Sequence, residues 1–339
     1  MRRSPMRPLA LIATIGTLAL TGCGLPAHET GSGAHSANPG KVIRAHEVMR
    51  LTEVHEETGM TLLEGPVFDE DGQLIVVDVT APAGEPKVLS VDVRKKTSRA
   101  LHTDGRGAYT SAQFSPYDGR LYLTDFAHGE IVSLAPDGGD PRTFFSGAVD
   151  GSPMNPDDLA FDEDGNLYVS DSRGLTEGQD RGRVVRIDRE GREATVLADG
   201  LGATNGISFD EDFRGLWISE LTRNRISYLR LGDAGETASR HTAVHVDGGI
   251  AQTDSIAVDA AGNIYQALHG RPAMVVYDRN GGHLATIEVP AGAKGLESAT
   301  NVAIRPGERT AYLTVSGPAG GYLYAFEAPA KGIRQSNGG

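Results

Sequence analysis

Short apolar runs separated by turns recur along the chain from about residue 63 onward. In each repeat an apolar run is followed by a turn and a second apolar run, as in LEGPVFDEDGQLIVVD at 63–78 and PDDLAFDEDGNLYVSD at 156–171. Turn dipeptides such as Asp71-Gly72 and Asp164-Gly165 lie between the two runs, which is typical of β-hairpins. Helical periodicity is weak throughout, so the pattern predicts strands.

The hairpin recurs six times at nearly constant spacing. Its first run ends in an apolar residue, and successive ends are 46, 47, 48, 49 and 46 residues apart. These six residues are Phe68, Phe114, Phe161, Phe209, Val258 and Ile304. Further alternating runs complete four short strands per unit, the period of a propeller blade. We therefore predict one all-β domain over 41–333, a six-bladed β-propeller with four-stranded blades closed by the segment 46–54, and a disordered tail at 334–339.

The N-terminus has the features of an export signal. Three arginines within the first seven residues precede an apolar run at 9–20, which is too short to span a bilayer. The run ends in Leu20-Thr21-Gly22-Cys23, which resembles the lipobox of bacterial lipoproteins. We predict a signal peptide at 1–22, a lipidated Cys23, a flexible tether up to residue 40, and an exported protein anchored to the outer face of the bacterial cell membrane only through its lipid. A plain secretory signal with a free thiol is the alternative.

Composition narrows the function classes. The 339 residues carry a formal charge of −13, which becomes −16 once the three leader arginines are removed. A net negative chain disfavours nucleic-acid binding, which needs clustered Lys and Arg. The single cysteine excludes a disulfide framework and a cysteine-rich zinc module. We expect a monomer, and the 44 glycines fit the many turns of a propeller.

Polar residues stand at one register position of every repeat. In a propeller, the first strands of all blades begin around one mouth of a central channel. Four residues before each apolar strand end, the chain has an oxygen-bearing side chain, and we call this set the polar ring. Its members are Glu64, Thr110, Asp157, Asn205, Asp254 and Thr300.

Three carboxylates pointed at one axis repel one another unless a cation lies between them. Oxygen donors without histidine favour a hard cation, which predicts calcium, with magnesium or manganese as alternatives. The alternative interpretation is that these polar groups cap the strand starts or line a water-filled channel.

Several segments resemble the calcium-dependent lactonase family of gluconolactonase, senescence marker protein (regucalcin) and luciferin-regenerating enzyme, nearest to its drug-responsive staphylococcal branch. The segments occur in the family's order and together cover roughly residues 60–333. They are Leu63-Glu64-Gly65, Asp157-Asp158-Leu159-Ala160-Phe161-Asp162, Asn205-Gly206-Ile207, Leu216-Trp217, Asp254-Ser255, Gly320-Gly321-Tyr322-Leu323-Tyr324 and Ala330-Lys331-Gly332.

The resemblance implies roles for individual residues. Glu64, Asn205 and Asp254 match the family's metal ligands, with Ser255 as an added ligand in the nearest branch. Asp254 also matches the proposed proton donor or acceptor, and Asp157 the residue that completes the site or contacts substrate. That branch has a second, structural calcium, which we do not expect here because the stretches 125–133 and 150–155 differ.

Three further residues are predicted to contact substrate. Thr110 and Thr300 complete the polar ring, and His269 follows a second strand of the repeat. For His269 a place in a surface loop is the alternative. Trp217 lies in a second strand and is expected in the core rather than at a ligand platform.

The sequence thus predicts a metal-dependent hydrolase of small-molecule lactones or related cyclic esters. Water attacks a metal-polarised carbonyl, with Asp254 or Asp157 as the acid/base. The alternatives are a non-catalytic surface lipoprotein with a structural calcium and a strictosidine-synthase-like lyase. No Gly-x-Ser-x-Gly elbow is present, and the Asp-Glu-Asp-Gly segments at 69–72 and 162–165 lack the Glu that ends an EF-hand loop, which predicts hairpin turns.

Overall fold

The computed structural model describes residues 40–175, 178–233, 235–291 and 293–337. The predicted signal peptide, Cys23 and the tether up to residue 39 lie outside the described residues. Within those ranges the chain forms 25 β-strands, one short 3-10 helix, η1 (Leu221–Arg223), and no α-helix. In the same ranges no helix has the length and apolar character needed to cross a membrane.

Four antiparallel four-stranded sheets follow one another along the chain. Each is a meander in which consecutive strands pair, because their apolar runs are joined by short turns. They are β3(Leu63–Phe68)–β4(Leu74–Asp78)–β5(Pro86–Asp92)–β6(Thr97–Thr103), β7(Tyr109–Phe114)–β8(Leu121–Asp125)–β9(Glu130–Leu134)–β10(Arg142–Ser146), β11(Pro156–Phe161)–β12(Leu167–Asp171)–β13(Gly182–Ile187)–β14(Ala194–Leu201) and β15(Thr204–Phe209)–β16(Gly215–Glu220)–β17(Arg225–Leu231)–β18(Thr237–His245).

The remaining strands form one nine-stranded sheet made of two meanders. One consists of β19(Gln252–Val258), β20(Ile264–His269), β21(Ala273–Tyr277) and β22(His283–Glu288), with β1(Lys41–Arg44) parallel to β22. The other consists of β23(Ser298–Ile304), β24(Thr310–Gly317) and β25(Gly320–Glu327), with β2(His46–Thr52) antiparallel to β25. A single residue pair, Leu268 with Ala299, joins the two meanders. The N-terminal segment therefore completes the last meander, as predicted for 46–54.

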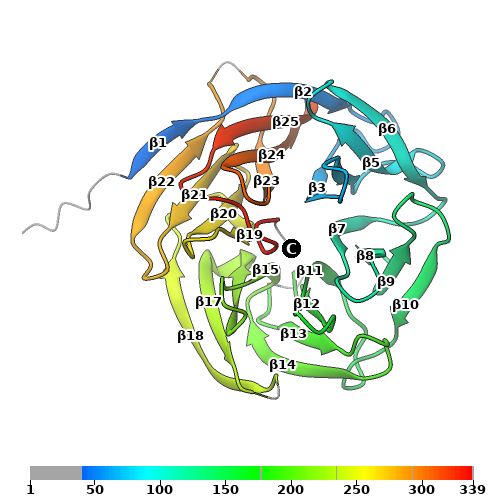
Figure 1. Cartoon of the computed structure of the whole chain (residues 1–339), viewed down its shortest axis with the longest axis vertical. Coiled ribbons are helices and arrows are strands. Elements are labelled where there is room, and N and C mark those ends of the chain that lie inside the picture. The colour runs from blue at the N-terminus through cyan, green and yellow to red at the C-terminus, as the bar shows by residue number, and fades with distance from the viewer. Residues whose placement is uncertain (1–39, 176–177, 234, 292, 338–339) are drawn as a thin grey trace, which may run out of the picture. The chain divides into compact units, whose positions relative to one another are not determined.

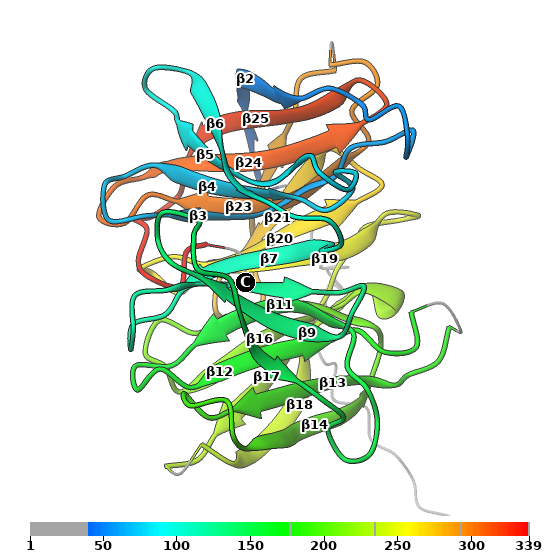
Figure 2. The ribbon, with the colours of Figure 1, turned by 90° about the vertical axis from the view of Figure 1, so that its right-hand side faces the viewer.

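The sheets surround a common centre, with β3, β7, β11, β15, β19 and β23 innermost (Figure 1). The side view shows β3, β7 and β11 following one another around that centre (Figure 2). Neighbouring sheets pack through apolar side chains: the ring of Tyr122 in β8 meets that of Phe161 in β11 edge-on, with centroids 5.1 Å apart. The fold is therefore all-β with repeated four-stranded sheets, an arrangement consistent with a β-propeller.

The Asp-Glu-Asp-Gly segments form the turns of hairpins. At 162–165, Asp162 Oδ1 accepts hydrogen bonds from the backbone N–H groups of Asp164 and Asn166 at 3.0 and 2.8 Å. Gly165 takes a positive φ of 86°, which favours glycine. The carboxylate is thus used to fix the turn between β11 and β12.

The end of the described chain differs from the prediction. Residues 334–337 were expected in a disordered tail, but they form hydrogen bonds with several inner strands. The side chains of Gln335 and Ser336 donate to the backbone oxygens of Asp210 and Val258, at the ends of inner strands, and the Asn337 side chain bonds to the side chain of Gln113. Residues 338–339 lie outside the described residues.

Candidate functional site

Each of the six inner strands has a β-bulge near its start. The pairing with the second strand shifts between Glu64 and Val67 in β3, and between Thr253 and Ile256 in β19. The other four inner strands shift at the equivalent point. A bulge interrupts the alternation of side chains and re-aims the residues beside it. The polar ring lies at or beside these bulges, so two consecutive residues of an inner strand contribute to the site.

Four members of the polar ring lie together at the centre. Asn205 Nδ2 donates a hydrogen bond to Asp157 Oδ2 at 3.2 Å, and the Asn205 side chain also bonds to Asp254. Glu64 lies close enough to Asp254 and Asp157 for their charges to raise its pKa. Glu64, Asn205 and Asp254 are buried, and Asp157 is partly exposed. The structure therefore brings together the residues predicted as metal ligands.

The environment strongly disfavours ionisation of these carboxylates. Burial, followed by the charge of Asp254, raises the pKa of Glu64 well above its ordinary value. Burial and Asp254 raise the pKa of Asp157 to about 8. The pKa of Asp254 is also raised by burial, although hydrogen bonds from His269, Ser255 and Asn205 oppose the shift. A cluster of carboxyl groups with raised pKa values is typical of a functional site.

The register of the repeats did not identify three further residues of the site: Ser111, Asp158 and Asn301. Each directly follows a polar-ring residue, and the bulge brings it inward. Asp158 is fully buried, with a pKa raised by burial and by Asp157, and the hydroxyls of Ser255 and Ser111 face it. Asn301 is also buried and hydrogen-bonds to Glu64. The Asp157-Asp158 pair was visible in the sequence, but strict alternation would have pointed the second carboxylate away.

Two predicted substrate contacts have their hydroxyls engaged within the protein. Thr110 Oγ1 donates to the backbone oxygen of Asp157 at 2.8 Å, and Thr300 Oγ1 to that of Leu63 at 2.6 Å. Thr300 is fully buried. These bonds tie neighbouring inner strands together, and contact of either threonine with a substrate stays a prediction.

Buried hydroxyls on the second strands connect the polar ring from one sheet to the next. Ser219 Oγ accepts from the N–H of Gly206 at 2.7 Å and donates to the backbone oxygen of Asp254 at 2.6 Å. Ser170 and Thr124 bond in the same way to the backbone oxygens of Asn205 and Asp157. In the sequence, these hydroxyls could have been found from the Thr or Ser that precedes an Asp or Glu at the end of the second apolar run of these repeats. Such shared hydroxyls fix the positions of ring residues on adjacent sheets.

His269 lies at the edge of the ring. Its Nδ1 atom is 3.6 Å from Asp254 Oδ2, and its side chain is 48% exposed. The Asp254 carboxylate raises the pKa of His269. The structure thus places this histidine beside a ring carboxylate, at the last residue of β20.

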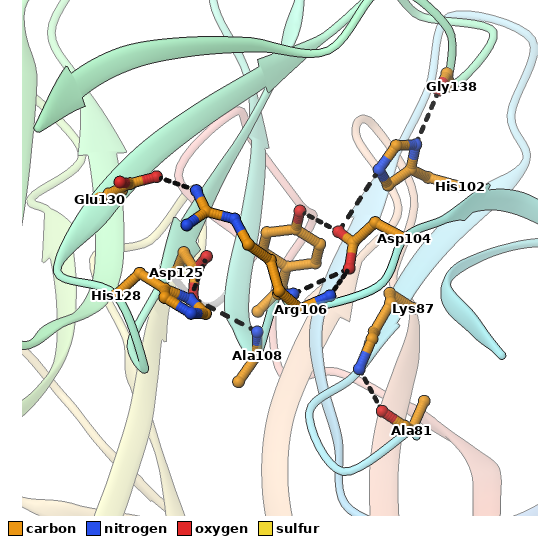
Figure 3. Close-up of polar contacts among 12 residues, drawn as sticks. Ala81, Lys87, His102, Asp104, Arg106, Ala108, Asp125, His128, Glu130 and Gly138 are labelled. Carbon is orange, nitrogen blue, oxygen red and sulfur yellow. Dashed lines mark hydrogen bonds and ion pairs between the residues drawn. The ribbon is translucent and has the colours of Figure 1, made fainter. Parts of the chain in front are cut away.

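A second polar network lies between β6 and the β8–β9 turn (Figure 3). Arg106 pairs with Glu130 at 2.6 Å, and Asp104 accepts from Tyr109 and from the backbone of Arg106. Asp125 accepts from the N–H of Ala108 at 3.3 Å and pairs with the His128 ring at 3.0 Å. The carboxylate of Asp125, at the start of the 125–133 stretch, is therefore engaged by protein donors.

The ring has the donor chemistry of a divalent-cation site. Glu64 Oε2 and Asn205 Oδ1 are buried without a hydrogen-bond partner, and both Asp158 oxygens lack a well-formed hydrogen bond. Buried oxygens of this kind cost free energy unless something positive satisfies them. Among the described residues, no group of three or more His, Cys, Asp or Glu side chains has an arrangement that would hold a metal ion by itself. The fit therefore depends on the acid and amide oxygens of the ring, a donor set suited to calcium.

Together, the repeated sheets and the acid-lined centre define a β-propeller-like protein with a polar central site. The chain belongs to the SMP-30/gluconolactonase/LRE-like family, whose characteristic region matches residues 62–317. This confirms the resemblance found in the sequence.

Named relatives agree with this membership. Lactonase drp35 of Staphylococcus haemolyticus (strain JCSC1435) is 27% identical over 286 residues, which cover 80% of this chain and 84% of the relative. A solved gluconolactonase from Xanthomonas campestris aligns with a TM-score of 0.66 and 21% identity, covering 86% of this chain and 99% of that one. A calcium-binding protein, regucalcin, from Agrobacterium tumefaciens aligns with a TM-score of 0.66 and 17% identity, covering 87% and 99%. Because the sequence identities are low, these structural matches show a shared fold.

Proposed function

We propose that the protein is a metal-dependent hydrolase of lactones or related cyclic esters, with calcium as the metal. The observation that carries this proposal is the cluster of buried, partly unsatisfied oxygens at the centre of the polar ring, in a chain whose family includes named lactonases. The name of the regucalcin neighbour supports calcium, and magnesium and manganese are the alternatives.

The polar ring supplies the metal ligands. Glu64, Asn205 and Asp254 would hold the cation, with Ser255 and Asp157 completing the site. Asn205 bonds to both Asp157 and Asp254, so it keeps the two carboxylates on either side of its amide. When bound, a divalent cation supplies a Lewis acid that polarises an ester carbonyl.

The chain's own acids would carry the proton. Asp254, or alternatively Asp157, accepts the proton of the attacking water and returns it to the leaving alkoxide when the ring opens. Asp157 is the more exposed of the two, whereas Asp254 is held by Asn205, the Ser255 N–H and His269. This scheme requires no nucleophilic side chain, because water supplies the attacking oxygen.

The proposal also covers the number of blades, the substrate, the oligomeric state and the location of the protein. We infer six blades, because the nine-stranded sheet consists of two four-stranded meanders joined by one residue pair, with β1 as an additional edge strand. The substrate is proposed to be a small molecule that His269, at the edge of the ring, helps to contact. The protein is proposed to act as a monomer without nucleic-acid partners, exported and anchored through a lipid on Cys23.

The test is hydrolysis across a panel of lactones with added calcium, with chelator, and for Asp254→Ala. The proposal predicts activity on at least one lactone that chelator abolishes, that calcium restores, and that the variant lacks. Activity that survives both chelator and substitution would refute the mechanism. No activity on any lactone would instead favour a binding protein with a structural cation.

A further inference from the structure

The chain after β25 returns to the centre of the molecule, where the red segment in Figure 1 lies among the inner strands. We call residues 331–337 the C-terminal plug. Ser336 within it is fully buried. Because the β2–β25 pairing already completes the last sheet, the plug is an additional connection between the ends of the chain's inner strands.

The plug bonds to the ends of two inner strands through backbone and side chain. The N–H of Ile304, at the end of β23, donates to the backbone oxygen of Ser336 at 2.7 Å. The N–H of Val258, at the end of β19, donates to the backbone oxygen of Gln335 at 3.2 Å, and Ser336 Oγ donates to Val258 O at 2.5 Å. Without the plug, these strand ends would leave buried polar groups unpaired.

Three further sheets are held in the same way. On β15, Ser208 Oγ donates to the backbone oxygen of Gln335 at 3.1 Å. On β7, the side chains of Gln113 and Asn337 hydrogen-bond to each other. Just beyond β11, the backbone oxygen of Asp162 accepts from Arg334 at 3.2 Å. The plug therefore touches five of the six inner strands or the turns that follow them.

At one position the plug lies so close to the neighbouring backbone that no side chain fits between them. Gly332 pairs with Pro306, and a Cβ atom on it would lie 2.6 Å from the backbone oxygen of Arg305 and closer still to that of Ile304. No side chain fits at that distance, so the glycine permits the close approach.

The plug and the polar ring lie at opposite ends of the same strands. Ring residues stand four positions before the apolar strand ends, and the plug binds at those ends or one residue away. Four residues of extended strand span about 13 Å. Only a few residues of each inner strand therefore separate the plug from the ring.

We infer that residues 335–337 are positioning residues, which fix the inner strands relative to one another and thereby hold the polar ring in the geometry that binds the cation. The role in cation binding rests on the proposed function. The role in holding the strands does not depend on it.

The experiment compares the full-length protein with Ser336→Ala, with Gly332→Ala and with a chain ending at Ala330. Lys331→Ala is the matched control, because that side chain is exposed and its backbone bond is retained. Hydrogen exchange is measured on chelator-treated protein at both ends of β15 and β19, the ring end and the end that touches the plug, and calcium affinity is then measured by calorimetry.

The inference predicts at least tenfold faster exchange at residues 204–206 and 253–255 in Ser336→Ala and Gly332→Ala, and at least tenfold weaker calcium binding, with Lys331→Ala unchanged. Faster exchange confined to the strand ends that touch the plug, with calcium affinity unchanged, would overturn it. If the shortened chain does not fold, the two point variants decide the question. A wild-type protein that fails to bind calcium refutes the proposed metal centre, whereas the exchange comparison still tests the plug.

Discussion

Removing divalent cations should make the stability of this protein fall as the pH rises from 5 to 8. In the cation-free protein, Glu64, Asp157, Asp158 and Asp254 have raised pKa values, chiefly because they are buried together. The same groups ionise near their ordinary pKa values of 3.8 to 4.5 in the unfolded chain. Between these limits the folded state binds more protons than the unfolded state, so the free energy of unfolding decreases as pH rises.

The size of the effect can be estimated from one group. Each proton kept only by the folded state lowers the free energy of unfolding by about 1.4 kcal/mol per pH unit. For Asp157, with a folded pKa of about 8, the loss between pH 5 and 8 is about 4 kcal/mol. In a protein of this size that corresponds to a fall in Tm of roughly 5–10 °C. The raised pKa of His269 acts in the same direction.

The assay is thermal unfolding from pH 5 to 8 with excess chelator and with excess calcium. Because the net negative charge of the whole chain also grows with pH, the quantity compared is the difference between the two series. We expect that difference to widen toward pH 8 and to be smaller in Glu64→Gln, which removes one ring charge. A chelated protein that is as stable at pH 8 as at pH 5 would contradict the description of the ring.

Three other substitutions test separate parts of the account. Ser219→Ala removes the hydroxyl that bonds to both Gly206 N and Asp254 O. We expect the free energy of unfolding in urea to fall by about 1–3 kcal/mol and the lactonase activity to decrease. An unchanged free energy of unfolding would argue against the bond between the two sheets. Gly206→Ala places a Cβ atom 2.5 Å from the backbone nitrogen of Ile256. Because β19 would have to move to make room, we expect a lower Tm by differential scanning fluorimetry. A variant with the native Tm and activity would refute this expectation. Cys23→Ala should abolish labelling by a palmitate analogue and release the protein from the membrane fraction, and persistent labelling would exclude Cys23 as the lipid site.

Repetition in the sequence made most of the fold predictable. A β-hairpin with an Asp-Gly turn at a fixed period identifies the strands, because apolar runs and turns are local properties. The register of the repeats alone also predicts that Glu64, Asp157, Asn205 and Asp254 lie together. Position within a repeat is a strong predictor because equivalent positions become neighbours around the centre.

What the sequence did not predict depends on non-local detail. The bulges bring Asp158 and Asn301 into the site. A pattern of strictly alternating side chains along a strand does not predict where a bulge occurs. The place of Thr300 in the ring was predicted, but not that its hydroxyl bonds to Leu63. The residues after 333 are polar and rich in turn formers, so only the unpaired ends of distant strands reveal why they pack at the centre.

The most direct test of the proposed metal-dependent lactonase is the initial rate of lactone hydrolysis as calcium is titrated into chelator-treated protein. It is measured for the wild type, for Asp254→Asn and for Asp212→Asn, a control that removes an exposed carboxylate outside the polar ring. We predict a saturable, calcium-dependent rate in the wild type and in Asp212→Asn, and a rate at least a hundredfold lower in Asp254→Asn. Equal rates in all three proteins, or a rate independent of calcium, would contradict the account.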